Sequence, residues 1–246
     1  MRQSTRSQRK SKVNFATDKP AECLFHLKVH LLDISPMIYR RVVVRGDTTI
    51  AELHHLIQIF MGWDNAHLHK FHIWGVDYGI RVPYGIYFRD DPCAVNIAGF
   101  GFKAGDKFSY VYDFGDYWQH ELRIEKITPI DSKYTIPLCT SGKRACPIED
   151  IGGPQAYKEA ISEQWHWLFI KSPNIINDFL QTEDLSELRE AFYDIPNWYI
   201  KHQPEFFDRE KVNRIIARLH QEMYQEKGGC DFWKNFGIYN DEFYDW

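Results

Sequence analysis

The chain has 246 residues, of which 44% are hydrophobic and 16% aromatic, and its formal net charge is −4. This length and apolar content are enough for one buried core with an extension, so a chain that is disordered throughout is excluded. The slightly acidic balance also excludes a globally basic nucleic-acid-binding domain, because such domains carry clustered positive charge.

The two ends of the chain differ in charge. Residues 1–12 carry basic side chains and no acid, and residues 227–246 are rich in aromatic and acidic residues. We interpret residues 1–20 as a basic disordered arm and 227–246 as an aromatic and acidic tail. No apolar segment is long enough to cross a bilayer, and no secretory signal is present, so we expect a cytoplasmic protein with no membrane contact.

The first half of the chain predicts two strands, a helix and a third strand. Residues 22–32 alternate between apolar and polar side chains, and residues 38–45 are rich in β-branched residues, which indicates a β-hairpin. Thr49 and Glu52 have the spacing of a capping box, and apolar residues follow at helical spacing. Residues 68–74 return to strand character.

The second half predicts another hairpin and then helices. Residues 75–106 form an irregular connection, and aromatic residues alternate along 107–114 and 118–124 on either side of a turn at Gly115. Beyond residue 153 apolar residues follow helical spacing. We therefore predict an α+β fold, with a β-grasp-like mixed sheet, one crossing helix and a C-terminal helical extension.

This pattern divides the chain into a core domain at 21–157 and a helical extension at 158–226 that packs on the core. Five cysteines, an odd and scattered number, indicate reduced thiols and no disulfide framework.

Three stretches of the sequence carry a family resemblance: TTIAELHHLIQIFMGWDNAHLHKFHI at 48–73, YVYDFGDYWQHELRIEK at 110–126, and CTSGKRACPIEDIGGPQAY at 139–157. Taken in this order they resemble the plasmid pRiA4b ORF-3-like family, over about residues 22–215. The family is also met as a passenger labelled TnpR in bacterial insertion elements. The resemblance implies an association with mobile elements but no defined reaction, since the family's members are largely uncharacterised.

Five polar residues form the candidate catalytic set: His67, His69, Asp113, Asp116 and His120. His67 and His69 share one face at the entry to a strand, and the other three surround the Gly115 turn. Histidines and carboxylates gathered at one end of a sheet could bind a metal or transfer protons. They could equally be hydrogen-bonded structural residues at the sheet end and in a polar turn.

A zinc site is the second candidate, with His69, His120, Cys139 and Cys146 as ligands. The two cysteines are spaced more widely than common zinc-binding pairs, and buried reduced thiols explain them as well. The resemblance weakens this site further, because Ile151 stands where many relatives have a third cysteine.

A third candidate is an anion site at the start of a predicted helix. Lys143 and Arg144 precede Gly152 and Gly153, and glycines at a helix N-terminus allow an anion to approach the free backbone N–H groups. The spacing matches neither a P-loop nor a dinucleotide fingerprint. A tight turn whose acids balance its bases is the alternative.

The leading interpretation is a non-enzymatic, mobile-element-associated accessory protein that binds a protein or nucleic-acid partner. The competing hypothesis is a metal-dependent hydrolase or nuclease that uses the His/Asp set. A structural zinc-binding module is the third. The sequence does not define a cofactor beyond a divalent metal such as zinc, nor an oligomeric state.

Overall fold

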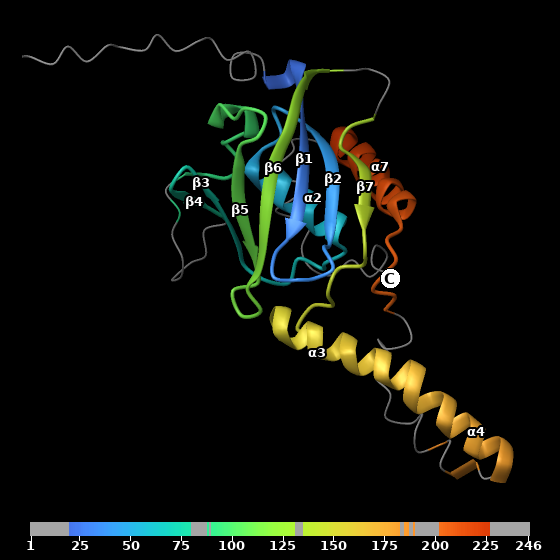
Figure 1. The fold of residues 1–246 in the computed structure, drawn as a ribbon. Coiled ribbons are helices and arrows are strands. Elements are labelled where there is room, and N and C mark those ends of the chain that lie inside the picture. The colour runs from blue at the N-terminus through green and yellow to red at the C-terminus, as the bar shows by residue number, and fades with distance from the viewer. Residues whose placement is uncertain are drawn as a thin grey trace, which may run out of the picture.

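The computed structural model describes residues 20–79, 88, 90–130, 135–182, 185, 186, 189 and 202–226. One open sheet of seven strands forms its centre, in the order β4-β3-β5-β6-β1-β2-β7 (Figure 1). The strands are β1 (Cys23–Leu31), β2 (Tyr39–Arg45), β3 (His69–Ile73), β4 (Val76–Tyr78), β5 (Lys107–Tyr112), β6 (Trp118–Pro129) and β7 (Leu138–Lys143).

The predicted α+β class is confirmed, and so are both predicted hairpins, β1–β2 and β5–β6. The expected mixed sheet is instead antiparallel in each strand pair that the structure describes. The reason is that β1 pairs with β6 in an antiparallel register, Val29 opposite Leu122, at the place where a β-grasp sheet would have a parallel pair. Strand periodicity specifies which residues face the core but not the direction of a distant partner.

Helix α2 (Ile50–Met61) covers one face of the sheet, as Figure 1 shows. Its N-terminus is the predicted capping box: the Glu52 backbone N–H donates to Thr49 Oγ1 at 3.1 Å, and the Thr49 N–H donates to Glu52 Oε2 at 2.7 Å. The helix ends at Gly62, whose φ of 87° is a left-handed conformation that favours glycine. Almost every residue of α2 is buried, so this helix is the centre of the core.

The strands place alternate side chains on the two faces of the sheet. In β1, Phe25, Leu27 and Val29 are fully buried against the α2 side, and His26 and Lys28 lie on the other face. We refer to the face that α2 covers as the inner face and to the opposite one as the outer face.

The other helical elements whose bounds fall within the described residues are two 3-10 turns (Pro20–Glu22 and Ile97–Phe100), α3 (Gly153–His166), a π-helical turn (Trp167–Lys171), α4 (Ser172–Thr182) and α7 (Arg209–Glu226). Helix α7 packs against β7 and α2, whereas α3, the π turn and α4 run away from the sheet as one rod (Figure 1). Among the described helices, none is long and apolar enough to cross a membrane. The predicted basic arm and aromatic tail lie outside the described residues.

Candidate functional site

Three loops meet at one end of the sheet, beside the start of α3. They are residues 63–68 before β3, residues 113–117 between β5 and β6, and residues 147–152 before α3. Each loop belongs to one of the three sequence stretches that carry the family resemblance. Stretches far apart in the chain therefore converge in space, which makes this end of the sheet the candidate site.

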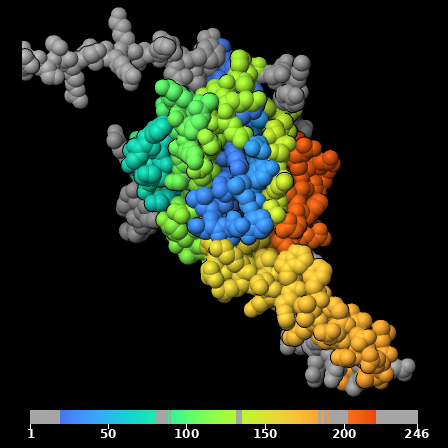
Figure 2. Space-filling model, in the orientation of Figure 1, coloured from blue at the N-terminus to red at the C-terminus, as the bar shows by residue number. Residues whose placement is uncertain are grey.

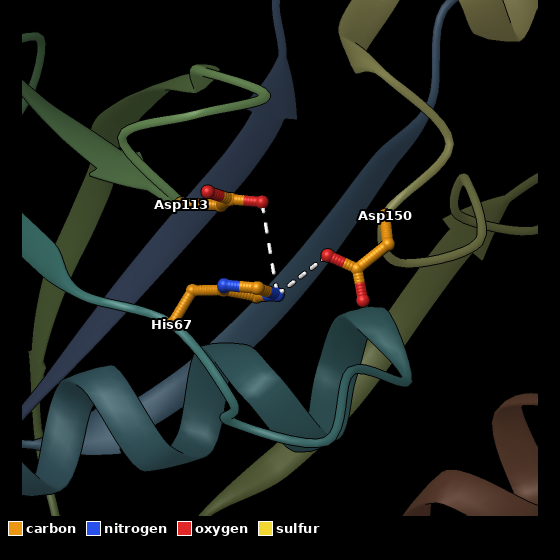
Figure 3. Close-up of side chains that lie close together, drawn as sticks. All are labelled: His67, Asp113 and Asp150. Atoms are coloured by element: carbon orange, nitrogen blue, oxygen red, sulfur yellow. Dashed lines mark ion pairs between the residues drawn. The ribbon is translucent and has the colours of Figure 1, made fainter.

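The centre of the site is the imidazole of His67, which lies between two carboxylates (Figure 3). His67 Nε2 is 3.1 Å from Asp150 Oδ1 and 3.8 Å from Asp113 Oδ2. The three ligand atoms lie within 4.8 Å of one another. His67 Nε2 is buried, and its contacts with the two carboxylates are ion pairs that lack hydrogen-bond geometry.

Asp113 is fixed by its own turn. Its side chain is only 9% exposed, its φ is 54°, and its Oδ1 accepts from the Gly115 N–H at 2.8 Å. The Asp113 backbone donates to the Leu68 carbonyl and accepts from the Tyr117 N–H. These bonds hold Asp113 in a left-handed conformation, which costs free energy and is common at functional sites. Asp113 Oδ2 remains directed at His67.

Asp150 is placed by a tight connection between two loops. The Gly152 N–H donates to Asp116 Oδ2 at 3.1 Å, and Gly153 approaches the Asp116 carbonyl so closely that an added Cβ would lie 2.6 Å from that oxygen. Gly153 has a φ of 85°. Only glycine fits such an approach with this backbone conformation. Asp116 therefore positions the loop and does not join the His67 group.

Glu149 forms a second polar contact under the same loop. Its Oε1 accepts a short hydrogen bond from the Tyr112 hydroxyl, and its Oε2 accepts from the Asp64 N–H at 3.0 Å. Burial raises the pKa of the Glu149 carboxyl, and the two hydrogen bonds oppose this rise. Burial also raises the pKa of the Tyr112 hydroxyl, and Glu149 adds to that effect.

His69 and His120 point into the core instead of into the site. Both are fully or almost fully buried, and burial lowers the pKa of each to about 3. The His69 ring stacks on His54 with centroids 3.3 Å apart, and His54 hydrogen-bonds to the Tyr110 hydroxyl at 2.8 Å. These imidazoles are neutral packing groups.

Cys139 and Cys146 are free, buried thiols, and burial raises the pKa of Cys139 to about 11 and of Cys146 to about 12. Cys146 Sγ lies 3.2 Å from Met61 Sδ. In the part of the chain that the structure describes, the two thiols form no group of three ligands with His69 or His120. The zinc site that the sequence suggested is therefore not assembled from these residues.

The residues of the predicted anion site already have partners within the protein. Arg144 forms an ion pair with Glu205 at 3.0 Å, and the Gly152 N–H is bonded to Asp116. Lys143 is the last residue of β7, opposite Tyr39. Binding of an external anion by Lys143, Arg144, Gly152 and Gly153 stays a prediction.

Of the five candidate catalytic residues, the structure brings together His67 and Asp113. Sequence reasoning did not assign Asp150 to the site, although this residue lies in the third family stretch. Sequence reasoning also did not predict the stack of His54 on His69, which belongs to the core and not to the site, because the position of His54 in α2 fits the apolar spacing of that helix. Asp150 could have been found only by placing the third stretch beside the other two.

Fold and site together define an α+β protein in which an open antiparallel sheet carries a three-loop polar site at one end. The sequence model of the family described as "Plasmid pRiA4b ORF-3-like protein" matches residues 24–165, more than half of the chain, and the chain belongs to this family. The match includes all three loops of the site.

Two similar proteins have names that assign them no function. The "Uncharacterized protein y4hQ" of Sinorhizobium fredii is 36% identical over 134 residues, which cover 54% of this chain and 69% of that protein. The crystal structure of MM3350 from Methanosarcina mazei Go1, a protein of unknown function, superposes with a TM-score of 0.54 at 29% identity. That comparison covers 78% of this chain and 98% of MM3350.

Proposed function

We propose that this protein binds a divalent transition-metal ion, Zn²⁺ or Mn²⁺, through His67, Asp113 and Asp150. The observation that carries this proposal is the buried Nε2 of His67, which has no hydrogen bond yet lies 3.1 Å and 3.8 Å from two carboxylate oxygens. One neutral imidazole and two carboxylates carry a charge of −2, which a divalent ion neutralises.

The geometry supports a metal ion because the ligand atoms are already close enough to share one. Zinc binds imidazole nitrogen and carboxylate oxygen at about 2.0–2.2 Å, so ligand atoms around one ion lie roughly 3–4 Å apart. The ligand atoms here lie within 4.8 Å of one another, and the Asp150 side chain, 75% exposed, has room to rotate toward a shared ion.

Metal-assisted hydrolysis is the second function that we propose, and one observation favours it. The Asp150 side chain is 75% exposed and that of His67 is 28% exposed, so the site opens to solvent. Three protein ligands leave one coordination position for water. Catalytic zinc sites have this arrangement, whereas structural zinc sites have four protein ligands. Glu149, whose pKa burial raises, adjoins Asp150 and is the candidate proton carrier.

The partner-binding role expected from the sequence is compatible with a metal site but does not depend on it. An accessory role for a mobile element rests on the family resemblance alone and stays a prediction.

Metal content measured by plasma mass spectrometry, on full-length protein purified without chelator, tests the first proposal. We expect close to one ion per chain, and calorimetric titration of the metal-free protein with ZnCl₂ or MnCl₂ should give one site. Asp150→Asn should weaken binding at least about tenfold, because it removes one charged ligand from an exposed position where folding is not affected. His67→Gln should do the same.

Asp178→Asn and His166→Gln are the matched controls, since both remove the same groups from exposed positions on α4 and α3. They should bind metal as the unaltered protein does. If the unaltered protein binds no ion, or if Asp150→Asn and His67→Gln bind as tightly as the controls, the three residues form an ordinary ion-pair cluster and the proposal is wrong.

A further inference from the structure

The outer face of the sheet carries four cations in one row. In the strand register, Lys107 lies opposite Arg123, Arg123 opposite Lys28, and Lys28 opposite Arg41. The row therefore crosses β5, β6, β1 and β2. Figure 2 looks onto this face, with β1 and β2 in blue at its centre.

Such a row is unfavourable for the sheet by itself, because like charges directly opposite each other on neighbouring strands repel. The outer two cations have carboxylate partners: Arg41 pairs with Glu125 at 2.9 Å and Lys107 with Glu121 at 2.6 Å.

The central two cations have no acidic partner among the residues that the structure describes. Lys28 Nζ lies 3.2 Å from Met37 Sδ and 5.1 Å from the centre of the Tyr39 ring, neither of which neutralises its charge. Arg123 is exposed. The middle of the row is thus a site of unbalanced positive charge on a chain whose net charge is −4.

Two hollows adjoin the row. One of about 420 Å³ follows the cations themselves, and its lining includes Lys28, Arg41 and Arg123 together with Glu121 and Glu125, the carboxylate partners of the outer two cations. The other, of about 630 Å³, shares the ion pair of Arg41 and Glu125 with the first and crosses the strands beside it. Its floor is a small apolar cluster, separate from the main core, and is formed by Leu24, Val43, Ile136 and Leu138. His26 and Lys126 also line this second hollow.

We propose that this outer face binds single-stranded nucleic acid, with phosphates along the cation row and bases in the apolar hollow. Neighbouring strands lie about 4.8 Å apart, so the row presents positive charge at regular steps across the sheet, as a phosphodiester backbone presents negative charge. The apolar hollow accommodates bases only when they are unstacked from a duplex, which favours a single strand. This inference is independent of the metal site.

Fluorescence anisotropy with a labelled oligothymidylate, an oligouridylate and a DNA duplex tests the proposal on the full-length protein at low salt. The double variant Lys28→Gln/Arg123→Gln should bind the single strands at least about tenfold more weakly than the unaltered protein. Its slope of log affinity against log salt should be shallower by roughly 1.4, since two phosphate contacts are lost.

Weaker binding by this variant should not result from unfolding. Removing like charges that face each other should leave its melting temperature equal to or higher than that of the unaltered protein. Lys158→Gln/Arg214→Gln makes the same change in net charge at exposed positions on α3 and α7, and should bind as the unaltered protein does. Failure of the unaltered protein to bind any single strand overturns the proposal, as does equal binding by the two double variants. Tighter binding of the duplex than of either single strand also overturns it.

Discussion

Buried histidines are the residues through which acid should destabilise this protein. Burial lowers the pKa of His120, and of His55 on α2, from the ordinary 6.5 to about 3. As pH falls below about 6.5, each histidine takes up a proton in the unfolded chain but stays neutral in the folded one. The stability of the fold is therefore complete above this pH and is lost progressively between pH 6.5 and 3.

We expect the free energy of unfolding to fall by up to about 1.4 kcal/mol per pH unit for each such histidine in this range. Urea titrations between pH 7 and 5 measure the slope. His120→Leu should reduce the slope, and the exposed His166→Gln should leave it unchanged. An unchanged slope in His120→Leu would mean that this imidazole is not kept neutral by burial.

His120 belongs to the core and not to the metal site. Because His120 Nδ1 bonds to the Trp118 carbonyl at 3.1 Å and its ring packs against Tyr110 and Trp63, it is a core residue and no ligand of the His67 group. His120→Leu should therefore keep the metal content of the unaltered protein.

At the scale of elements, the contact between the β5–β6 turn and the start of α3 keeps Asp150 beside His67. Gly153→Ala should weaken both stability and metal binding, because the new Cβ would meet the Asp116 carbonyl at 2.6 Å. We expect a loss of at least about 2 kcal/mol in the free energy of unfolding.

Gly105→Ala is the matched control for this prediction. Gly105 has a similar φ of 96°, but its Cβ would meet nothing within 4 Å. The Gly105→Ala substitution should lower the free energy of unfolding by only about 1 kcal/mol, the strain of an alanine in a left-handed conformation, and leave the metal content unchanged. Equal losses in the two variants, measured by thermal melting, would show that the contact with Asp116 does not matter.

At the scale of the whole molecule, α7 closes one edge of the sheet. The side-chain amide of Asn213 on α7 pairs with the backbone of the edge strand β7, as a neighbouring strand would. Its Oδ1 accepts from the Cys139 N–H at 2.8 Å, and its Nδ2 donates to the Cys139 carbonyl at 2.9 Å. Val212 and Ile216 join the main core from the same helix. An edge strand without such cover exposes its free backbone groups.

Asn213→Ala should lower the free energy of unfolding by about 1–3 kcal/mol, since it removes two hydrogen bonds at a partly buried position. Hydrogen exchange should become faster in β7 before it does so in β1 or β6. Arg214→Ala, next to it on the exposed side of α7, should change neither quantity. Uniform acceleration across the sheet would indicate that α7 does not protect this edge in particular.

The sequence by itself determined the α+β class, both hairpins and the capped helix α2. These features depend on local rules, namely the alternation of side chains in strands, helical spacing and the capping pair Thr49 and Glu52. It also indicated His67 and Asp113 as polar groups at strand ends.

Only the tertiary structure decided the direction of the β1–β6 pairing and the membership of the site. Both depend on contacts between residues far apart in the chain, for which periodicity carries no information. Asp150 reaches His67 because two glycines let its loop approach Asp116, and the four cations of the outer face meet only because four strands pair in one register. Local sequence specifies each strand, whereas the packing of the whole chain specifies which side chains become neighbours.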